Sequence, residues 1–203
     1  MTSIMKKKMK YIAGMLVVSM CAMTSCSDDF LQTDSPNQPS QSTYWQTESD
    51  ALMALTACYD AMQSDHLYDD NVDGGGFGFL MRETSTDNGD HTWGAWMKGS
   101  TVSMCTSSTT DPCFSNYWNV NYEVIKRCNL LIENIDRITE MDAGKIASFK
   151  AEAIALRALM YCNLVSVFRD VPYLTKPLTL AEAQAPKSLR DEIVSSIIAD
   201  LKT

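Results

Sequence analysis

The sequence predicts an all-α protein, made of helical hairpins that are joined by long irregular loops. Two observations carry this prediction. Apolar residues recur at steps of three and four along two long stretches, about 115–138 and 145–168. Glycine, serine, threonine and asparagine gather between residues 65 and 113 instead, which is typical of loops. A hydrophobic content of 45% is high enough for a packed core and excludes a disordered chain.

The first thirty residues have the order of a bacterial export signal. Four lysines precede an apolar run of about 13 residues, too short for a bilayer core that needs roughly 20. Small residues and then Cys26 follow, so we expect Cys26 to become the lipidated first residue of the mature chain. The alternatives are a secreted protein with Cys26 as a free thiol, and an uncleaved membrane anchor. The expected divisions are a signal peptide (1–25), a lipidated tether and lead-in (26–46), and a helical domain (47–203).

The charge of the chain limits its partners. The net charge is −8, and removal of residues 1–25 takes away four lysines and no acid, which leaves −12. A chain this acidic is poorly suited to nucleic acid or to an anionic lipid surface. We therefore expect no nucleic-acid partner, and contact with the membrane only through the lipid.

The first half of the helical domain contains one clear helix. Thr47 is a plausible N-cap, and apolar residues at 52, 55, 59 and 62 predict a helix that ends near Ser64. A short helix is expected within 77–86, and residues 87–111 are expected to be mostly irregular.

The second half contains three predicted helices. The stretch 115–138 is an amphipathic helix, and 145–168 is a helix that Asp170-Val171-Pro172 ends. A stripe of small residues along the latter favours burial on most sides; it comprises Ala151, Ala155, Ala158, Cys162 and Val165. A last helix is expected from Ser188, as its cap, to Thr203. Its apolar stripe reaches the chain end, so we expect the chain to be the N-terminal part of a longer protein.

The cysteines beyond the signal support neither a zinc site nor a disulfide framework. Five remain after Cys26, with irregular spacing and no C-x-x-C pair. Cys58, Cys128 and Cys162 lie in helical patterns and are expected to be buried. Cys105 and Cys113 share a loop-like segment and could pair, and the sequence leaves that open.

Four segments match motifs of one known family. They are Cys-Ser-Asp-Asp-Phe-Leu at 26–31, Tyr-Trp-Gln-Thr-Glu-Ser-Asp-Ala at 44–51, the spacing of Trp118, Tyr122, Ile125 and Asn129, and Ala-Glu-Ala-Ile-Ala-Leu-Arg-Ala at 151–158 with Asp-Val-Pro-Tyr at 170–173. Together they resemble the SusD/RagB family, surface lipoproteins of Bacteroidetes, over the first part of its usual length. Ala151 and Arg169 stand where the family pattern has glycine, a change that we expect to weaken neither the helix nor its end.

The resemblance implies a fold and a role. The fold would be helical hairpins of the tetratricopeptide-repeat type with ligand-binding loops. The role would be a surface-exposed outer-membrane lipoprotein, carrying palmitate on Cys26, that binds starch or another polysaccharide or oligosaccharide. It would pass this glycan to a SusC-like TonB-dependent outer-membrane transporter. The alternatives are a peptide-binding member of the family, and a lipid-anchored enzyme whose active site lies in missing C-terminal residues.

The candidate ligand-binding residues are Trp93 and Trp96, with Asn88 and Tyr68. Aromatic faces stack on the apolar C–H faces of sugars, and an amide such as Asn88 can hydrogen-bond their hydroxyl groups. The alternative is that the two tryptophans anchor their loop in the core.

No catalytic residue, metal or cofactor is predicted. His66 and its acidic neighbours fit an exposed loop better than a metal site, and the calcium-like run at 87–90 lacks a closing glutamate. Glu152 and Arg157 are five residues apart on one helix and are expected to pair structurally.

Overall fold

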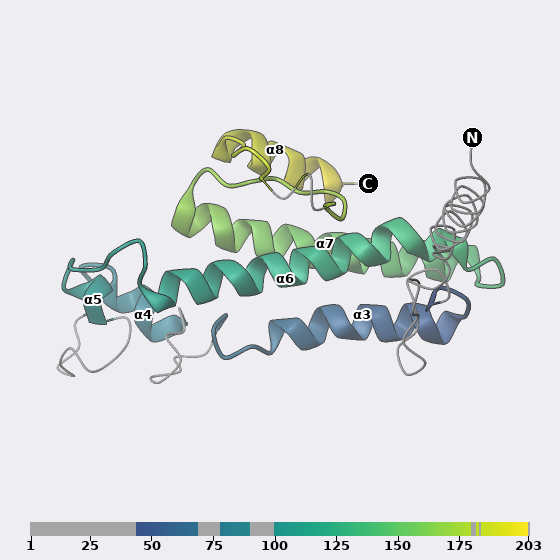
Figure 1. Cartoon of the computed structure of the whole chain (residues 1–203), viewed down its shortest axis with the longest axis horizontal. Coiled ribbons are helices and arrows are strands. Elements are labelled where there is room, and N and C mark those ends of the chain that lie inside the picture. Colours follow the sequence, from purple (N-terminus) through teal and green to yellow (C-terminus); the bar gives the residue numbers. More distant parts are fainter. Residues whose placement is uncertain (1–43, 69–77, 90–99, 180–181, 183, 203) are drawn as a thin grey trace, which may run out of the picture. The chain divides into compact units, whose positions relative to one another are not determined.

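The computed structural model describes residues 44–68, 78–89, 100–179, 182 and 184–202. The chain divides into two compact units, Met1–Tyr44 and Trp45–Thr203, and all helices described below belong to the second. In chain order they are α3 (Glu48–Met62), α4 (Phe79–Thr84), α5 (Ser100–Ser103), α6 (Pro112–Asn134), the 3-10 turn η2 (Ile135–Arg137), α7 (Ala143–Phe168) and α8 (Arg190–Asp200). The prediction of an all-α fold is confirmed (Figure 1).

The helix α3 begins where its capping signal predicts. The Thr47 hydroxyl accepts the Asp50 amide at 3.3 Å, and the Asp50 carboxylate accepts the Thr47 amide at 2.7 Å. The Thr47 hydroxyl also donates to the Asp50 carboxylate at 2.8 Å, and this bond, together with the bond from the Thr47 amide, lowers the pKa of Asp50. The buried face is set by Ala51, Leu55 and Cys58, whereas Leu52 is 53% exposed. The predicted stripe was therefore rotated by about one residue, because both faces of this helix carry apolar side chains.

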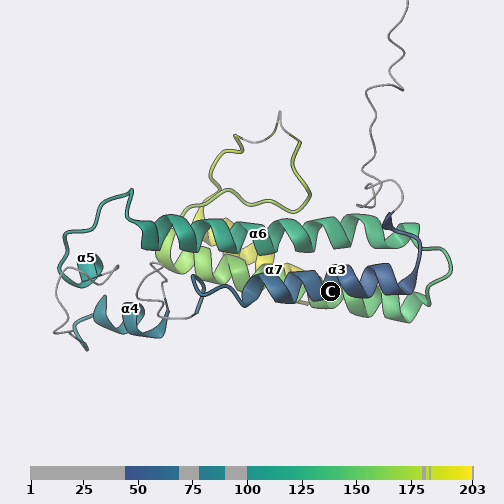
Figure 2. The same cartoon turned by 60° about the horizontal axis from the view of Figure 1, so that its bottom comes forward.

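The helices α6 and α7 form the central hairpin, and α3 packs against both (Figures 1 and 2). The Asp111 side chain caps α6 by accepting the Cys113 amide at 3.3 Å, so the helix starts three residues earlier than predicted. Fully buried side chains fill the space between these helices; among them are Ile125, Leu131, Met160, Tyr161 and Leu164. Burial of this apolar area supplies most of the stabilisation.

The helix α7 is buried on most sides between Ala153 and Val165, as predicted. Of the small-residue stripe, Ala158 and Val165 are buried, but Ala151, Ala155 and Cys162 are exposed. The prediction of a buried Cys162 was therefore wrong, because the covering helices leave one face of α7 open. Among the described helices, α7 has the length and apolar composition of a membrane span, and half of its most apolar stretch is buried inside the protein. We therefore interpret α7 as the core helix of this unit.

The cysteines that the structure describes are all free thiols. Cys58, Cys113 and Cys128 are buried, whereas Cys105 is exposed. Cys105 and Cys113 are therefore not paired in this structure.

A chain reversal after α7 sets the position of α8. The N-cap residue of α8 is Leu189, and the Asp170 carboxylate, twenty positions earlier, adds a side-chain cap by accepting the Arg190 amide at 2.9 Å. Ser188, the predicted cap, instead donates its amide to the Val171 carbonyl at 3.0 Å. Ile193 and Ile197 are buried and face the hairpin. The assignment of Ser188 was wrong because the side chain that caps this helix is brought there by the tertiary fold.

Arg169, at the reversal itself, has a φ of 63° and a ψ of −91°, a conformation that favours glycine. Its place at the C-cap contradicts the expectation that replacing the family's glycine leaves the helix end unaffected. Arg169→Gly should therefore stabilise the protein by about 1 kcal/mol, raising the thermal midpoint by roughly 3 °C in calorimetry. Arg169→Ala is the control, because it removes the exposed guanidinium and keeps the strain. Equal midpoints for the two variants would contradict the argument.

Candidate functional site

The described segments between α3 and α6 lie at one end of the hairpin, where α6 begins and α7 ends (Figure 2). We call this region the loop end; its described residues are 64–68, 78–89 and 100–111. Arg82 of α4 donates to the Tyr117 hydroxyl of α6, and the Thr101 hydroxyl of α5 donates to Asp111. These contacts attach α4 and α5 to the start of α6.

Tyr68 is anchored at the loop end through its hydroxyl group. The buried Asn163 amide of α7 donates to the Tyr68 oxygen at 3.0 Å and to the Asn121 side chain of α6 at 3.2 Å. Asn121 in turn donates to the Tyr117 carbonyl at 2.7 Å. The Tyr68 residue is nevertheless 45% exposed. A phenol that is fixed at one end and open to solvent is suited to stacking on a flat apolar ligand face.

The other predicted ligand-binding residues are not brought together with Tyr68 by any described contact. Asn88 is exposed in the turn after α4, where its amide donates to the Thr86 hydroxyl at 3.2 Å. Trp93 and Trp96 lie outside the described residues, as does Cys26. Both tryptophans fall in the stretch between Gly89 and Ser100, whose described ends belong to the loop end.

A hollow of about 420 Å³ also opens at the loop end. Its lining residues are Ser107, Ser108, Thr109, Phe114, Val167 and Phe168. The two phenylalanine rings meet edge to face at 6.4 Å, and Trp118 packs on Phe168 at 5.0 Å. Hydroxyl groups beside aromatic rings match the polar and apolar faces of a sugar. No local sequence pattern predicts this hollow, because its two halves are about 60 positions apart in the chain.

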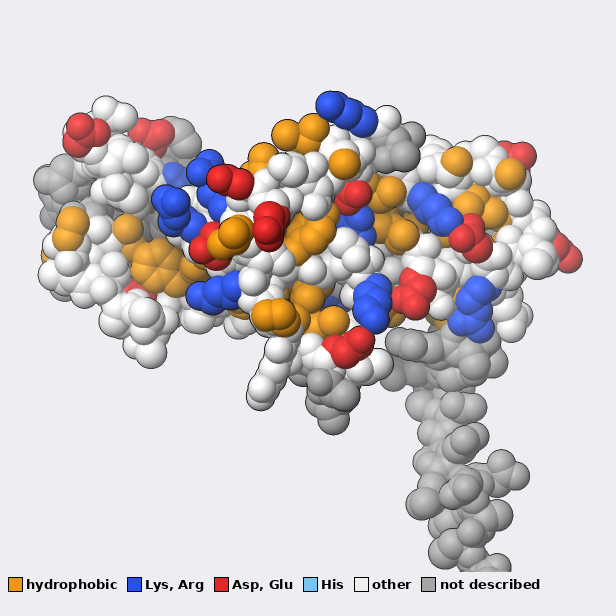
Figure 3. Space-filling view, turned by 90° about the horizontal axis from the view of Figure 1, so that it is seen from above, with side chains coloured by type: hydrophobic (Ala, Val, Ile, Leu, Met, Phe, Trp, Pro, Cys, Tyr) orange, Lys and Arg blue, Asp and Glu red, His pale blue; other side chains and the backbone are white. Residues whose placement is uncertain are grey.

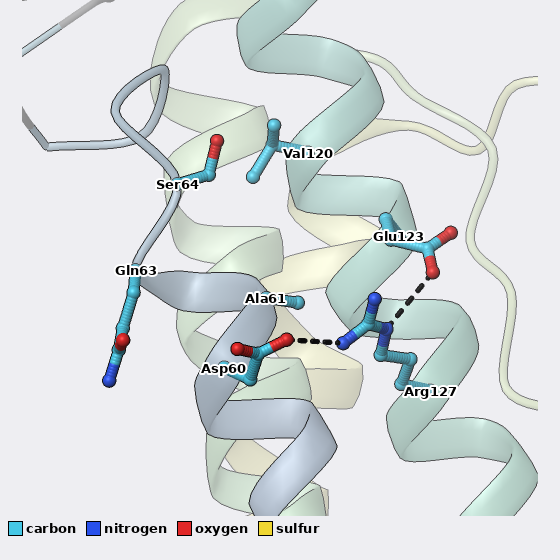
Figure 4. Close-up of a pocket in the computed structure, with 7 residues that line it drawn as sticks. All are labelled: Asp60, Ala61, Gln63, Ser64, Val120, Glu123 and Arg127. Carbon is cyan, nitrogen blue, oxygen red and sulfur yellow. Dashed lines mark hydrogen bonds and ion pairs between the residues drawn. The ribbon is translucent and has the colours of Figure 1, made fainter.

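A second hollow, of about 450 Å³, lies between α3 and α6 and carries charged residues (Figure 4). Arg127 pairs with Asp60 at 3.2 Å and with Glu123 at 3.0 Å. Although burial opposes them, these contacts raise the pKa of Arg127. The guanidinium also donates to the Ala57 carbonyl at 2.6 Å. Arg127 therefore joins two helices, and a hollow without an aromatic lining residue is a weaker sugar site.

The most specific motif residues have a structural role. Arg157, 6% exposed, donates to Asn129 at 2.8 Å and to Asp200 at 2.9 Å. Asn129 donates to the Leu174 carbonyl at 2.9 Å, and Tyr122 donates to the Pro172 carbonyl at 2.7 Å. These residues hold the segment after α7 onto α6 and α7.

The expected Glu152–Arg157 pair does not form. Glu152 instead accepts the Tyr59 hydroxyl of α3 at 3.0 Å, and Arg157 pairs with Asp200 of α8. Residues five apart on a helix point in different directions, so each reaches a different neighbouring helix.

Within the described part of the chain, no group of three or more His, Cys, Asp or Glu side chains is placed so that it could hold a metal ion. His66 Nδ1 is buried without a hydrogen-bond partner among the described residues. Basic and acidic side chains are interspersed over the face seen in Figure 3, with no continuous basic surface.

Comparison with known proteins identifies the family. Residues 29–203 match a SusD-like family described as starch-binding and associating with the outer membrane. SusD-like protein P38 of Formosa agariphila is 28% identical over 97% of this chain and 37% of its own length. SusD-like protein P25 of the same organism is 25% identical over 92% of this chain and 36% of its own length. The chain thus spans little more than a third of the curated relatives it matches.

Solved structures give the same assignment. A laminarin-binding SusD-like protein is 29% identical with a TM-score of 0.63, over 78% of this chain and 33% of that one. A SusD superfamily protein from Bacteroides vulgatus, 22% identical over 79% of this chain and 34% of that one, shares the fold with a TM-score of 0.64. The helical hairpins are thus of the tetratricopeptide-repeat type found in these proteins. This chain belongs to the SusD-like family.

Proposed function

We propose that this chain is the N-terminal part of a surface-exposed outer-membrane lipoprotein that binds a glycan and delivers it to a SusC-like TonB-dependent transporter. The match of residues 29–203 to a family described as starch-binding carries this proposal. The likeness to a laminarin-binding protein supports a glucan as the ligand class. Affinity would come from stacking and a few hydrogen bonds, with no catalytic step.

The lipid anchor is part of the proposal. Residues 1–25 would be removed as a signal peptide, and Cys26 would carry the lipid. Residues 27–46 would then serve as the tether before α3. Such an anchor leaves the helical domain outside the cell, where a polysaccharide can reach it.

We place the glycan site at the loop end. Trp93 and Trp96 would provide stacking faces, with Tyr68 and Asn88 beside them. The fixed and partly exposed Tyr68 and the hydroxyl-lined hollow at Phe114 support this location, because both combine an aromatic ring with hydrogen-bonding groups.

The combined change Trp93→Ala and Trp96→Ala tests this site in the full-length native protein. We expect an affinity loss of at least about tenfold for laminarin or soluble starch, measured by calorimetry, because two stacking contacts are removed. The matched control is Leu52→Ala with Met53→Ala, which removes two exposed apolar side chains from α3. It should leave affinity unchanged, and circular dichroism should show that both variants fold.

Other outcomes would redirect the proposal. Undiminished binding in the double tryptophan variant would remove both residues from the site. Binding of peptides, with neither glucan bound, would favour the peptide-binding alternative. Hydrolysis of an offered polymer would contradict a purely binding role.

A further inference from the structure

Two buried cysteines face each other across the contact between α3 and α6. Cys58 and Cys128 are both 0% exposed, and each belongs to the buried face of its helix. The neighbouring residues are joined directly, because Arg127 donates to the Ala57 carbonyl at 2.6 Å and pairs with Asp60 at 3.2 Å. Arg127 therefore joins α3 to α6 directly beside the two cysteines in the sequence.

The two thiols lie close enough to shift each other's pKa. Cys58 Sγ also donates to the Ala54 carbonyl at 3.3 Å, which directs its side chain within the interface. The contact from Cys128, aided by the charge of Arg127 and opposed by burial, lowers the pKa of Cys58. The same contact and burial raise the pKa of Cys128. The two thiols therefore titrate as a pair, in which the first proton is lost more readily than the second.

We propose that Cys58 and Cys128 form an intramolecular disulfide that joins α3 to α6 when the protein meets a disulfide oxidant. Two thiols that are buried in the same packed helix interface, beside residues that are joined across it, need little backbone movement to reach bonding geometry. Its formation in the cell rests on the proposed export, since disulfides persist in oxidising compartments.

The chemistry is thiol–disulfide exchange with a disulfide such as oxidised glutathione. The Cys58 thiolate attacks one glutathione sulfur, and the other leaves as a thiolate that takes a proton. Cys128 then loses its proton and attacks the Cys58 sulfur, which releases the second glutathione as a thiol. Two protein thiols are oxidised and one glutathione disulfide is reduced. Because both cysteines are buried, the exchange requires a transient opening of α3 or takes place during folding.

The bond would join positions 58 and 128, and the loop of chain between them contains the loop end. A loop of roughly 70 residues loses much of its unfolded-state freedom when it is closed, so the disulfide should raise the thermal midpoint by about 10 °C. Such a disulfide would hold α3 against α6 beside the region proposed to bind glycan.

The experiment treats the full chain, purified in detergent, with oxidised glutathione and maps its peptides by mass spectrometry without reductant. We expect a linked pair of peptides that contains Cys58 and Cys128, lost after reduction, together with the rise in midpoint. A Cys105→Ser and Cys162→Ser variant, which removes two exposed thiols, should keep the link.

Three results would overturn the proposal. They are alkylation of both cysteines without prior reduction, linkage of either one to a different cysteine, and a midpoint that does not change when the link forms. Glycan binding plays no part in this measurement, so a failure here and a failure of the proposed function can be told apart.

Discussion

Arg157→Ala is expected to destabilise the domain by about 2–3 kcal/mol, because it removes a charged donor from several hydrogen bonds and leaves a buried acceptor unpaired. The guanidinium is 6% exposed and joins Asn129 of α6, the Thr175 carbonyl and Asp200 of α8. Its loss leaves the Asn129 oxygen without its donor in the interior and frees the segment after α7. Urea unfolding followed by circular dichroism measures the effect.

The matched control for this variant is Arg190→Ala. Arg190 is exposed at the start of α8, so its truncation should change the free energy of unfolding by less than about 0.5 kcal/mol. An Arg157→Met variant retains the apolar stem and separates lost packing from lost hydrogen bonds. Equal stability of Arg157→Ala and Arg190→Ala would show that the network does not hold the fold.

Tyr161→Phe should cost about 1–3 kcal/mol, although it removes a single oxygen atom. The Tyr161 hydroxyl accepts the Leu174 amide at 2.6 Å and donates to the Leu174 carbonyl at 3.1 Å. The Leu174 amide would lose its partner beside a fully buried ring, whereas the Leu174 carbonyl would keep the hydrogen bond from Asn129. The ring contact with Tyr173, at 4.7 Å, would remain, so the change reports the hydrogen bonds alone.

The same urea experiment tests this variant against Tyr59→Phe. Tyr59 is 43% exposed and its hydroxyl contacts Glu152 near solvent, so its loss should cost less than about 0.5 kcal/mol. Arg157 and Tyr161 hold the same short segment, and the double variant should therefore lose less than the sum of the single losses. Strict additivity would mean that the two residues act independently.

These variants also separate structural motif residues from ligand-binding ones. Asn129, Arg157 and Asp170 belong to the segments that carry the family resemblance, and all three make hydrogen bonds within the fold. The family motifs therefore mark residues that attach α8 and the segment before it to the hairpin, and they do not indicate where the ligand-binding site lies. The residues proposed to bind glycan lie in the irregular segments between α3 and α6.

The candidate site was only partly predictable. Aromatic residues in a glycine-containing loop pointed to Tyr68, Trp93 and Trp96, but not to what holds them. Tyr68 is anchored by Asn163, which is 95 positions away in the sequence. The hollow at Phe114 and Phe168 depends on the meeting of two helix ends. Neither contact leaves a local signal, because each forms only when α6 and α7 pack side by side.

Local sequence patterns were enough to identify the helical segments, and they predicted the bounds of α3, α6 and α7 to within a few residues. Helix formation depends on local periodicity and on caps such as Thr47, which neighbouring residues supply. The tertiary structure alone decided which faces are buried, as the exposed Leu52 and Cys162 show. It also decided that Asp170 caps α8 and that Arg157 pairs with Asp200 rather than with Glu152. Burial and pairing depend on the neighbouring helix, and that neighbour is chosen by the packing of the whole unit.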